Sequence, residues 1–211
     1  RAKARSSGPL RWHTDRCDVV GLLCVRSAMK GGVSRIVSVP AVSNAILERR
    51  PDLHALLCAD YHRSRQGEEA GGEAATYALP IFAMRDGKFT TQYSRTFVEA
   101  AQKIPSIPRL TAAQDEALDL LASVCDKLGY EMELGPGDIQ LLNNHVIYHG
   151  RTAYEDASRP GQDRLLEHHL GAARHAPVDH LFGERPAQPG QSMKTIRPAA
   201  CPLSGSSTRM R

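Results

Sequence analysis

The stretch GDIQLLNNHVIYHGRT, residues 137–152, decides how the rest of the chain is arranged. Its pattern predicts a turn, a buried strand, a polar break at Asn143 and Asn144, and a second short strand that ends at His149. His145 and His149 lie on one face if this segment is extended, because side chains alternate along a strand. The stretch therefore predicts a sheet that presents an imidazole at one surface.

A second segment with side chains that could bind a metal lies far upstream, in the tetrapeptide WHTD at residues 12–15. If His13, Thr14 and Asp15 are extended, an imidazole and a carboxylate point to the same side. One more imidazole, brought across a barrel, would complete two nitrogens and one oxygen on one side of a metal. This is the facial ligand set of non-haem Fe(II) oxygenases. Two histidines and a carboxylate also suit zinc, so a hydrolytic zinc site is an alternative.

The composition sets limits on fold and partners. The chain has 211 residues, of which 41% are hydrophobic and 24% charged, as expected for one globular domain with a real core. A net charge of +4 is mild, and 5% aromatic residues leave little for base stacking. We therefore expect no nucleic-acid partner and no membrane partner, and a homo-oligomer is left open.

Cysteine usage indicates the compartment. The five cysteines are odd in number and form no CxxC pair, which argues against a disulfide framework or a cysteine-zinc site. We find neither an apolar run of membrane-spanning length nor a secretory signal in the sequence. These features favour a reducing, cytoplasmic location.

The sequence predicts a mixture of short strands and helices along the chain. Strands are predicted at 19–26, 34–39, 77–84, 88–93, 130–134 and 164–170, and helices at 41–49, 51–57, 96–103 and from a capping box at Thr111 and Gln114 to Gly129. Asp86–Gly87 predicts a hairpin turn, and residues 63–76 predict an exposed loop. We expect one mainly β domain over residues 1–196, a β-barrel or jelly roll with helical insertions, followed by a poorly ordered tail at 197–211.

Four pieces of sequence, taken in order, resemble one known family. They are WHTDRCDVVGLLCVR, KGGVSRIVS, DGKFTTQYSR and GDIQLLNNHVIYHGRTAYED, and they span roughly residues 10–170. The chain resembles the taurine/2-oxoglutarate dioxygenase family, also called clavaminate-synthase-like. The resemblance implies a double-stranded β-helix (jelly roll). It also implies an Fe(II)-dependent oxygenase that uses 2-oxoglutarate and O₂ to hydroxylate a small molecule, with release of succinate and CO₂.

The resemblance also implies roles for particular residues. His13 and Asp15 match the first histidine and the carboxylate ligand of the metal, and His149 matches the distal histidine. Ser34 falls where the family contacts the co-substrate carboxylate. Arg164 is the nearest match to the arginine that pairs with the same carboxylate. A guanidinium suits this role because it is always charged and can bind both carboxylate oxygens.

The chain departs from the family pattern in three places. Only 12 residues precede His13, where the family has a substantial segment, so we expect the fold to lack part of its N-terminal region. Arg16 follows the metal motif where relatives have a small residue. The run LLEHHL at 165–170 replaces an arginine and an aromatic residue. These departures support an alternative, a truncated or degenerate member that acts as a non-catalytic binding module.

Several other polar residues have simpler interpretations. We expect His145 to be a surface residue or a neighbour of the ligands, Arg151 to form a structural ion pair, and Asn143 and Asn144 to shape the turn. Cys17 is expected to be a small buried residue. The histidines at 168, 169, 175 and 180 fit no tight metal site, and we expect them to be mostly exposed.

Overall fold

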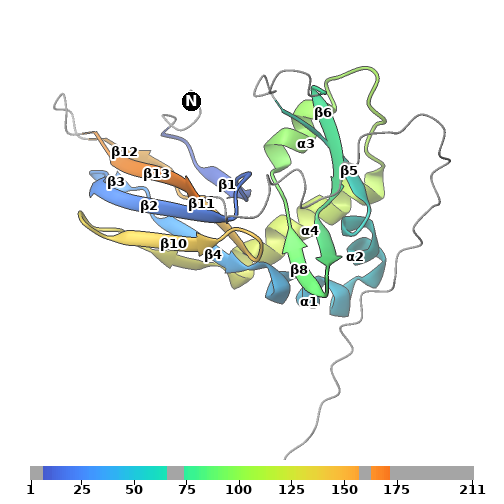
Figure 1. The fold of residues 1–211 in the computed structure, drawn as a ribbon, viewed down its shortest axis with the longest axis horizontal. Coiled ribbons are helices and arrows are strands. Elements are labelled where there is room, and N and C mark those ends of the chain that lie inside the picture. The colour runs from blue at the N-terminus through green and yellow to red at the C-terminus, as the bar shows by residue number, and fades with distance from the viewer. Residues whose placement is uncertain (1–6, 66–73, 157–162, 172–211) are drawn as a thin grey trace, which may run out of the picture.

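Two antiparallel sheets face each other in the computed structural model, which describes residues 7–65, 74–156 and 163–171 (Figure 1). Among the described residues, the first sheet has the order β1-β11-β4-β9, with β1 at Leu10–His13, β11 at Ile147–Arg151, β4 at Ser34–Ser38 and β9 at Tyr130–Met132. The second has the order β10-β2-β13, with β10 at Ile139–Asn143, β2 at Val19–Arg26 and β13 at Leu165–Gly171. A short pair joins β3 (Lys30–Gly31) to β12 (Tyr154–Glu155).

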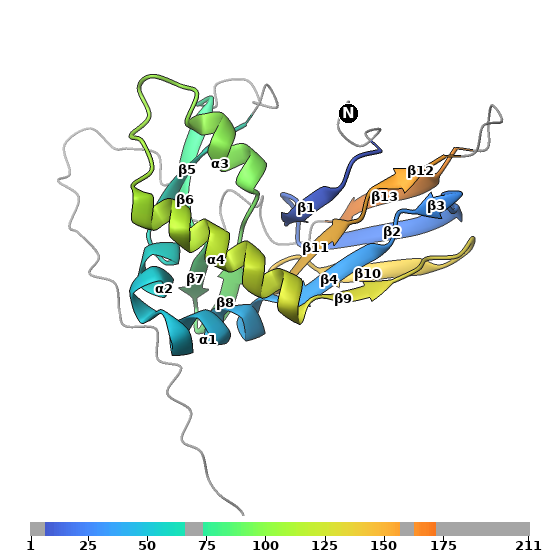
Figure 2. The same ribbon diagram turned by 180° about the vertical axis from the view of Figure 1, so that it is seen from behind.

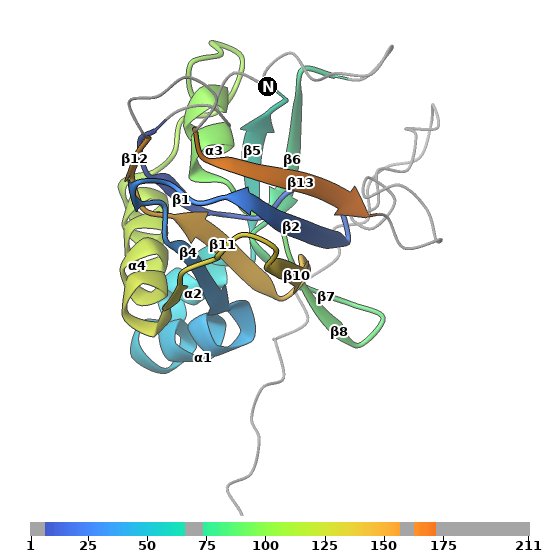
Figure 3. The same cartoon turned by 90° about the vertical axis from the view of Figure 1, so that its left-hand side faces the viewer.

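A small apolar core lies between the two sheets. Val20 from β2 and Leu142 from β10 are buried there against Ile36 from β4 and Ile147 from β11. The view in Figure 3 shows β13, β2 and β10 as one layer, with β4 and β11 in the layer behind. The described fold is therefore mainly β and layered like a jelly roll, as the sequence predicts.

The helices and the remaining strands form a second mass at one end of the sheets (Figure 2). The helices are α1 (Val39–Arg49), α2 (Pro51–Leu57), α3 (Arg95–Ala101) and α4 (Ala112–Leu128). The strand pairs are β5 (Asp60–Ser64) with β6 (Thr76–Pro80), and β7 (Phe82–Arg85) with β8 (Lys88–Thr91). Their apolar faces enclose the larger core, which includes Ile46, Leu53, Leu57, Leu118 and Leu121. Periodic apolar residues thus bury one stripe of each long helix.

Trp12 and its neighbours attach the metal-motif strand to α4. The Trp12 indole N–H donates to Asp126 Oδ1 at 2.8 Å, and Arg35 donates to the same oxygen at 2.7 Å. The Arg35 guanidinium also lies 4.5 Å from the centroid of the Trp12 ring. Since Arg35 is on β4 and Trp12 on β1, this cluster fixes the strand that carries His13 against the rest of the sheet.

Most of the predicted elements are confirmed, including the Thr111–Gln114 capping box and the hairpin turn at Asp86–Gly87. Two predictions are wrong. The single strand expected at 77–84 is interrupted at Ile81, whose N–H donates to Leu57 O, and β6 pairs with β5 instead of continuing into β7. The predicted start of the loop at residue 63 is too early, because Arg63 and Ser64 still belong to β5.

The burial of Arg63 explains why the strand β5 was not predicted from the sequence. The side chain is 1% exposed, and its guanidinium donates to four backbone carbonyls, those of Tyr61, Leu79, Pro80 and Gln92. An arginine normally marks a surface, but here it satisfies carbonyls inside the fold. The predicted tail at 197–211 lies outside the described residues. No described helix combines the length and the apolar character needed to cross a membrane.

Candidate metal centre

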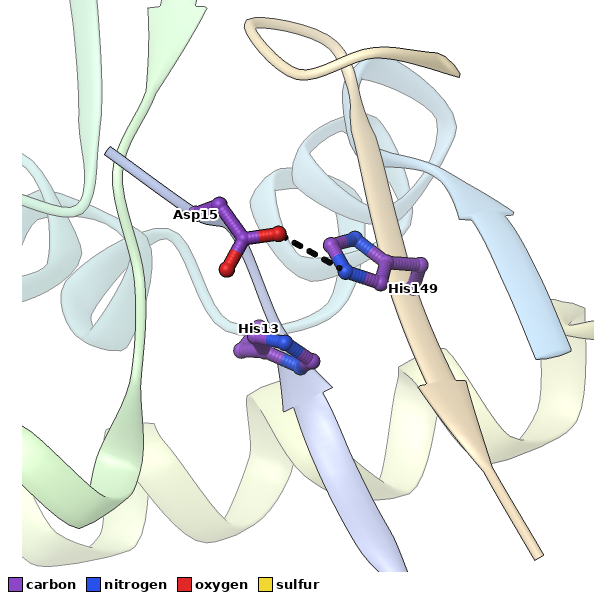
Figure 4. Close-up of side chains that lie close together, drawn as sticks. All are labelled: His13, Asp15 and His149. Atoms are coloured by element: carbon purple, nitrogen blue, oxygen red, sulfur yellow. Dashed lines mark ion pairs between the residues drawn. The ribbon is translucent and has the colours of Figure 1, made fainter. Parts of the chain in front are cut away.

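His13 and His149 come together because their strands are neighbours in the first sheet. β1 pairs antiparallel with β11, and in this register His13 lies opposite His149. The ring centroids are 4.2 Å apart (Figure 4). Gly150 allows the close approach of β1, since a Cβ atom at this position would lie 2.8 Å from Leu10 O. One strand pairing thus brings together two imidazoles that are far apart in the sequence.

Asp15 lies just beyond the end of β1, in a loop that Asn144 holds. The Asn144 side chain accepts from the Asp15 N–H at 3.2 Å and donates to Asp15 O and, at 2.7 Å, to Cys17 O. The Thr14 N–H donates to Tyr93 O at 2.8 Å. Because Asn144 is 3% exposed, these hydrogen bonds are shielded from water. Asn143 shapes the turn as expected, because its Oδ1 accepts from the His145 N–H at 3.0 Å, whereas the Asn144 side chain holds the Asp15 loop, which sequence reasoning missed.

The three predicted ligands form a compact donor set. One ligand atom from each of His13, Asp15 and His149 lies within 4.8 Å of the others. Asp15 Oδ2 is 3.3 Å from His149 Nε2 (Figure 4). Two ligand atoms that bind one small ion at about 2.1 Å and at a right angle are separated by about 3 Å. The observed spacing therefore fits a common metal ion.

Two buried polar atoms of this set lack hydrogen-bond partners among the described residues. They are His149 Nδ1 and Asp15 Oδ2, and the nearest partners of Asp15 Oδ2, the Nε2 atoms of His149 and His168 at 3.3 and 3.2 Å, lie at ion-pair distance without hydrogen-bond geometry. An unsatisfied buried carboxylate oxygen is costly, and such groups normally pair or bind a metal. Two imidazoles and one carboxylate, with no fourth ligand in the group, match the facial set used for non-haem iron. The residues present thus fit an iron ion.

His13 is held in the tautomer that a metal needs. Its Nδ1 lies 2.9 Å from Arg11 O, and a carbonyl can only accept, so this nitrogen carries the proton. The lone pair of the neutral ring is then on Nε2. Metal-binding histidines usually donate their second N–H to a carbonyl or carboxylate in this way.

Burial and neighbouring charges keep His13 and Asp15 in the protonation states that suit metal binding. Burial, followed by the charge of His149, lowers the pKa of His13 to about 4. Burial alone would raise the pKa of Asp15, but contacts with His149 and His168 and the charge of His13 lower it below its usual range. At neutral pH the centre therefore holds a neutral His13 imidazole and an ionised Asp15 carboxylate.

His168 is exposed, as predicted, and it also lies beside this centre, which the sequence did not indicate. Its Nε2 is 3.2 Å from Asp15 Oδ2, and 42% of its side chain is exposed. This contact with Asp15 raises the pKa of His168. The sequence held a signal for this position of His168. It lies four residues after Arg164, a predicted site residue, and residues at even spacing along a strand share a face.

A cavity of about 690 Å³ opens next to the donor set. His13, His149 and His168 line it together with Ser34 and Arg164. The structure thus brings the two predicted co-substrate residues to the same cavity as the histidines. Ser34 Oγ donates to Gln140 Oε1 at 3.0 Å. Arg164 passes over Gly32, where a Cβ atom would lie 2.9 Å from its Nε, and donates to Gly32 O at 3.4 Å.

A second arginine lines the cavity beside Arg164. Arg151 lies 4.4 Å and Arg164 5.3 Å from the ring centroid of Tyr154. Arg151 donates to the backbone oxygens of Gly8 and Thr152. These two hydrogen bonds hold the Arg151 guanidinium against the backbone. Burial, followed by the charge of Arg164, lowers the pKa of Arg151.

His145 is not part of the donor set. Its Nε2 lies 2.7 Å from Asp18 Oδ1 and its Nδ1 lies 3.0 Å from Thr90 Oγ1. Both ring nitrogens are thus engaged outside the centre, as expected for a residue near the ligands. Cys17 is buried, as predicted, and its thiol donates to Val19 O.

Comparison with known proteins gives a consistent family. The profile of the family described as "Taurine catabolism dioxygenase TauD, TfdA family" matches residues 1–171. FR-33289 synthase of Streptomyces rubellomurinus is 31% identical over 168 residues, which are 74% of this chain and 48% of that protein. A taurine hydroxylase-like protein of Stachybotrys chartarum is 32% identical over 73% of this chain and 40% of its own length. The chain spans about half the length of these relatives or less.

Solved structures share the fold. An asparagine oxygenase in complex with Fe(II), 2S,3S-3-hydroxyasparagine and succinate superposes with a TM-score of 0.60 at 22% identity, over 78% of this chain and 50% of its own. The non-haem iron oxygenase OrfP, in complex with Fe and alpha-ketoglutaric acid, gives a TM-score of 0.56 at 18% identity over the same shares of the two chains. At these identities, the likeness concerns the fold alone.

Proposed function

Because the chain belongs to the taurine catabolism dioxygenase TauD, TfdA family, we propose that it is an Fe(II)- and 2-oxoglutarate-dependent oxygenase whose iron is held by His13, Asp15 and His149. The observation that carries this proposal is the donor set itself, three ligand atoms within 4.8 Å of one another at the wall of a cavity. When bound, the iron and 2-oxoglutarate would supply dioxygen activation, with conversion of 2-oxoglutarate to succinate and CO₂ and hydroxylation of a substrate C–H bond.

The protein's own residues prepare this chemistry. The Arg11 carbonyl orients the His13 ring, and burial keeps that ring neutral. Asn144 holds the backbone on both sides of the Asp15 side chain. The pairing of β1 with β11 sets the distance between the two imidazoles. Ligands held in this way need no rearrangement to receive a metal ion.

For the co-substrate, we assign Ser34 and Arg164 to the distal carboxylate of 2-oxoglutarate. Both line the cavity that His13 and His149 line. The Arg164 guanidinium can offer two parallel N–H donors to a carboxylate, and the Ser34 hydroxyl can turn from Gln140 Oε1 to add its one O–H donor. The ring of Tyr154 lies against Arg164 and supports the orientation of its guanidinium plane.

The substrate is proposed to be a small molecule. The cavity of about 690 Å³ exceeds what 2-oxoglutarate alone requires, and drug-sized ligands occupy cavities of about 300–1,000 Å³. Solved relatives were crystallised with hydroxylated asparagine and arginine. Since the chain spans about half of its relatives, the hydroxylation of a particular substrate stays a proposal.

Equilibrium metal binding tests the assignment. Anaerobic titration of the full chain with Fe(II) should give one tight site, and the loaded protein should consume O₂ only when 2-oxoglutarate is present. His149→Ala should bind no iron, whereas His145→Ala, which alters an imidazole outside the donor set, should bind it normally. Tight zinc binding with hydrolytic activity and no O₂ uptake would support the zinc alternative. Absence of any metal binding would support the non-catalytic module.

A further inference from the structure

From Leu166 onward the side chains of β13 alternate between the cavity and the opposite face. Leu166 and His168 line the cavity, as expected for residues spaced by two, while Arg164 and Leu165 at the start of the strand both line it. His169 and Glu167 point the other way and form an exposed pair at 3.5 Å. In the β2 register, His168 lies opposite Leu22, which also lines the cavity. The strand therefore carries His168 to the metal side.

Within the described part of the chain, the contact of His168 with the metal set is the one to Asp15. Its Nε2 lies 3.2 Å from Asp15 Oδ2, nearly the same distance as His149 Nε2 to that oxygen. His168 is nevertheless outside the group of ligand atoms that lie within 4.8 Å of one another. It thus approaches the carboxylate from a position that the three ligands do not occupy. A ligand carboxylate commonly accepts such a contact from a residue that does not bind the metal.

We propose that His168 is a positioning residue, which holds the Asp15 carboxylate in the orientation required by the metal through its Nε2 contact with Oδ2. This inference rests on the proposed metal site. The need for such a contact follows from the place of Asp15. It lies in a loop beyond the end of β1, where the sheet no longer orients the side chain, and Asn144 bonds to backbone atoms of this loop. Among the described residues, His168 and His149 are the ion-pair partners of the carboxylate itself.

Three variants of the full chain separate this role from a general effect on the strand. His168→Leu removes the contact and keeps a side chain of moderate size. His168→Gln keeps an N–H group at a comparable reach. His169→Leu makes the same apolar change on the opposite face of the same strand. The measurement is Co(II) binding by calorimetry without oxygen or 2-oxoglutarate, together with the visible absorption spectrum of the cobalt-loaded protein, which reports the coordination geometry.

The proposal predicts that His168→Leu weakens Co(II) binding by about 10–100-fold, the usual effect of losing a partner of a metal ligand. Its cobalt spectrum should also change, because the carboxylate is no longer held. His168→Gln should recover most of the affinity and the wild-type spectrum, and His169→Leu should match the wild type in both. Wild-type affinity and spectrum in folded His168→Leu would overturn the proposal. So would equal losses in the Leu and Gln variants.

Failure of the underlying site gives a different result. If the wild-type chain itself binds no Co(II) and no Fe(II), the proposal of a metal site is wrong, and so is the proposed role of His168. If the wild type binds metal and His168→Leu binds it equally well, only the role of His168 is wrong. Thermal unfolding of each metal-free variant identifies any loss of metal affinity that is caused by unfolding of the variant.

Discussion

His13 and His149 lie directly opposite each other on adjacent antiparallel strands, with ring centroids 4.2 Å apart. The pairing of β1 with β11 thus brings together two of the three residues of the donor set before any metal is considered. Asp15 completes it from the loop that follows β1. The centre therefore depends on one strand register and one loop conformation, and these can be perturbed separately.

Loss of the Asn144 side chain should loosen Asp15 without touching a ligand. Asn144→Ala removes one acceptor and two donor contacts to the loop at residues 15–17. Unfolding free energy should fall by about 1–3 kcal/mol, and metal affinity by about tenfold or more. Chemical denaturation and Co(II) calorimetry measure the two effects. Asn143→Ala, one residue away with an exposed side chain, should leave metal affinity unchanged. Equal metal affinities in the two variants would contradict the role of Asn144.

Removal of the Arg164 guanidinium should weaken co-substrate binding. Arg164→Ala is expected to raise the KM for 2-oxoglutarate by about 10–100-fold, since a charged hydrogen bond contributes about 1.5–3 kcal/mol. Fe(II) affinity should not change, because Arg164 is not in the donor set. Arg26→Ala, at the same cavity, serves as the control. An unchanged KM in Arg164→Ala would remove this residue from the co-substrate site.

Acid should destabilise the metal-free protein through His13. The pKa of His13 is about 4 in the folded state, below the ordinary value of 6.5. Between these two values the unfolded chain binds a proton that the folded chain does not, so stability falls as pH decreases from 6.5 to 4. The lowered pKa of buried His54 acts in the same direction. Urea denaturation at pH 6.5 and 5, with chelator present, measures the slope.

The control for this pH effect is a histidine at the surface. His13→Gln should reduce the loss of stability between pH 6.5 and 5, whereas His169→Gln should keep it. His168 does not disturb this window, because its raised pKa changes stability at pH values above 6.5. An identical pH slope in His13→Gln and wild type would show that His13 does not remain neutral in the folded protein.

Arg63 should be a stability residue that has no part in the metal site. Arg63→Met leaves four buried backbone carbonyls without their donor and should cost about 3 kcal/mol or more of unfolding free energy. Arg85→Met, on the exposed β7–β8 hairpin, should change stability by about 0.5 kcal/mol or less. Comparable unfolding midpoints for the two variants would contradict the structural role of Arg63.

The sequence was informative where the signal is local. The capping box at Thr111, the Asp86–Gly87 turn and the alternation of β10 each arise from neighbouring residues, and each is confirmed. The His13–Thr14–Asp15 spacing indicated a shared face, and the ligand atoms do converge, although β1 ends at His13 and the Asp15 loop is held by Asn144.

Features that depend on distant partners escaped prediction. Arg63 is polar in a buried strand, and only the carbonyls of β6 and Gln92 explain its place. His168 is exposed, as predicted, but its place beside Asp15 depends on the pairing of β13 with β2. The choice of His149 over His145 came from the family resemblance, and the register explains it, because His149 lies within β11 opposite His13 and His145 lies in the turn before that strand.

Succinate release is the most direct test of the central proposal. The full chain, loaded with Fe(II) without oxygen and supplied with 2-oxoglutarate, should release succinate slowly when O₂ is admitted, even without added substrate. Asp15→Ala should release none, because the carboxylate ligand is gone, and His145→Ala should behave as the wild type. Succinate release by Asp15→Ala at the wild-type rate, or no release by an iron-loaded wild type, would contradict the proposal.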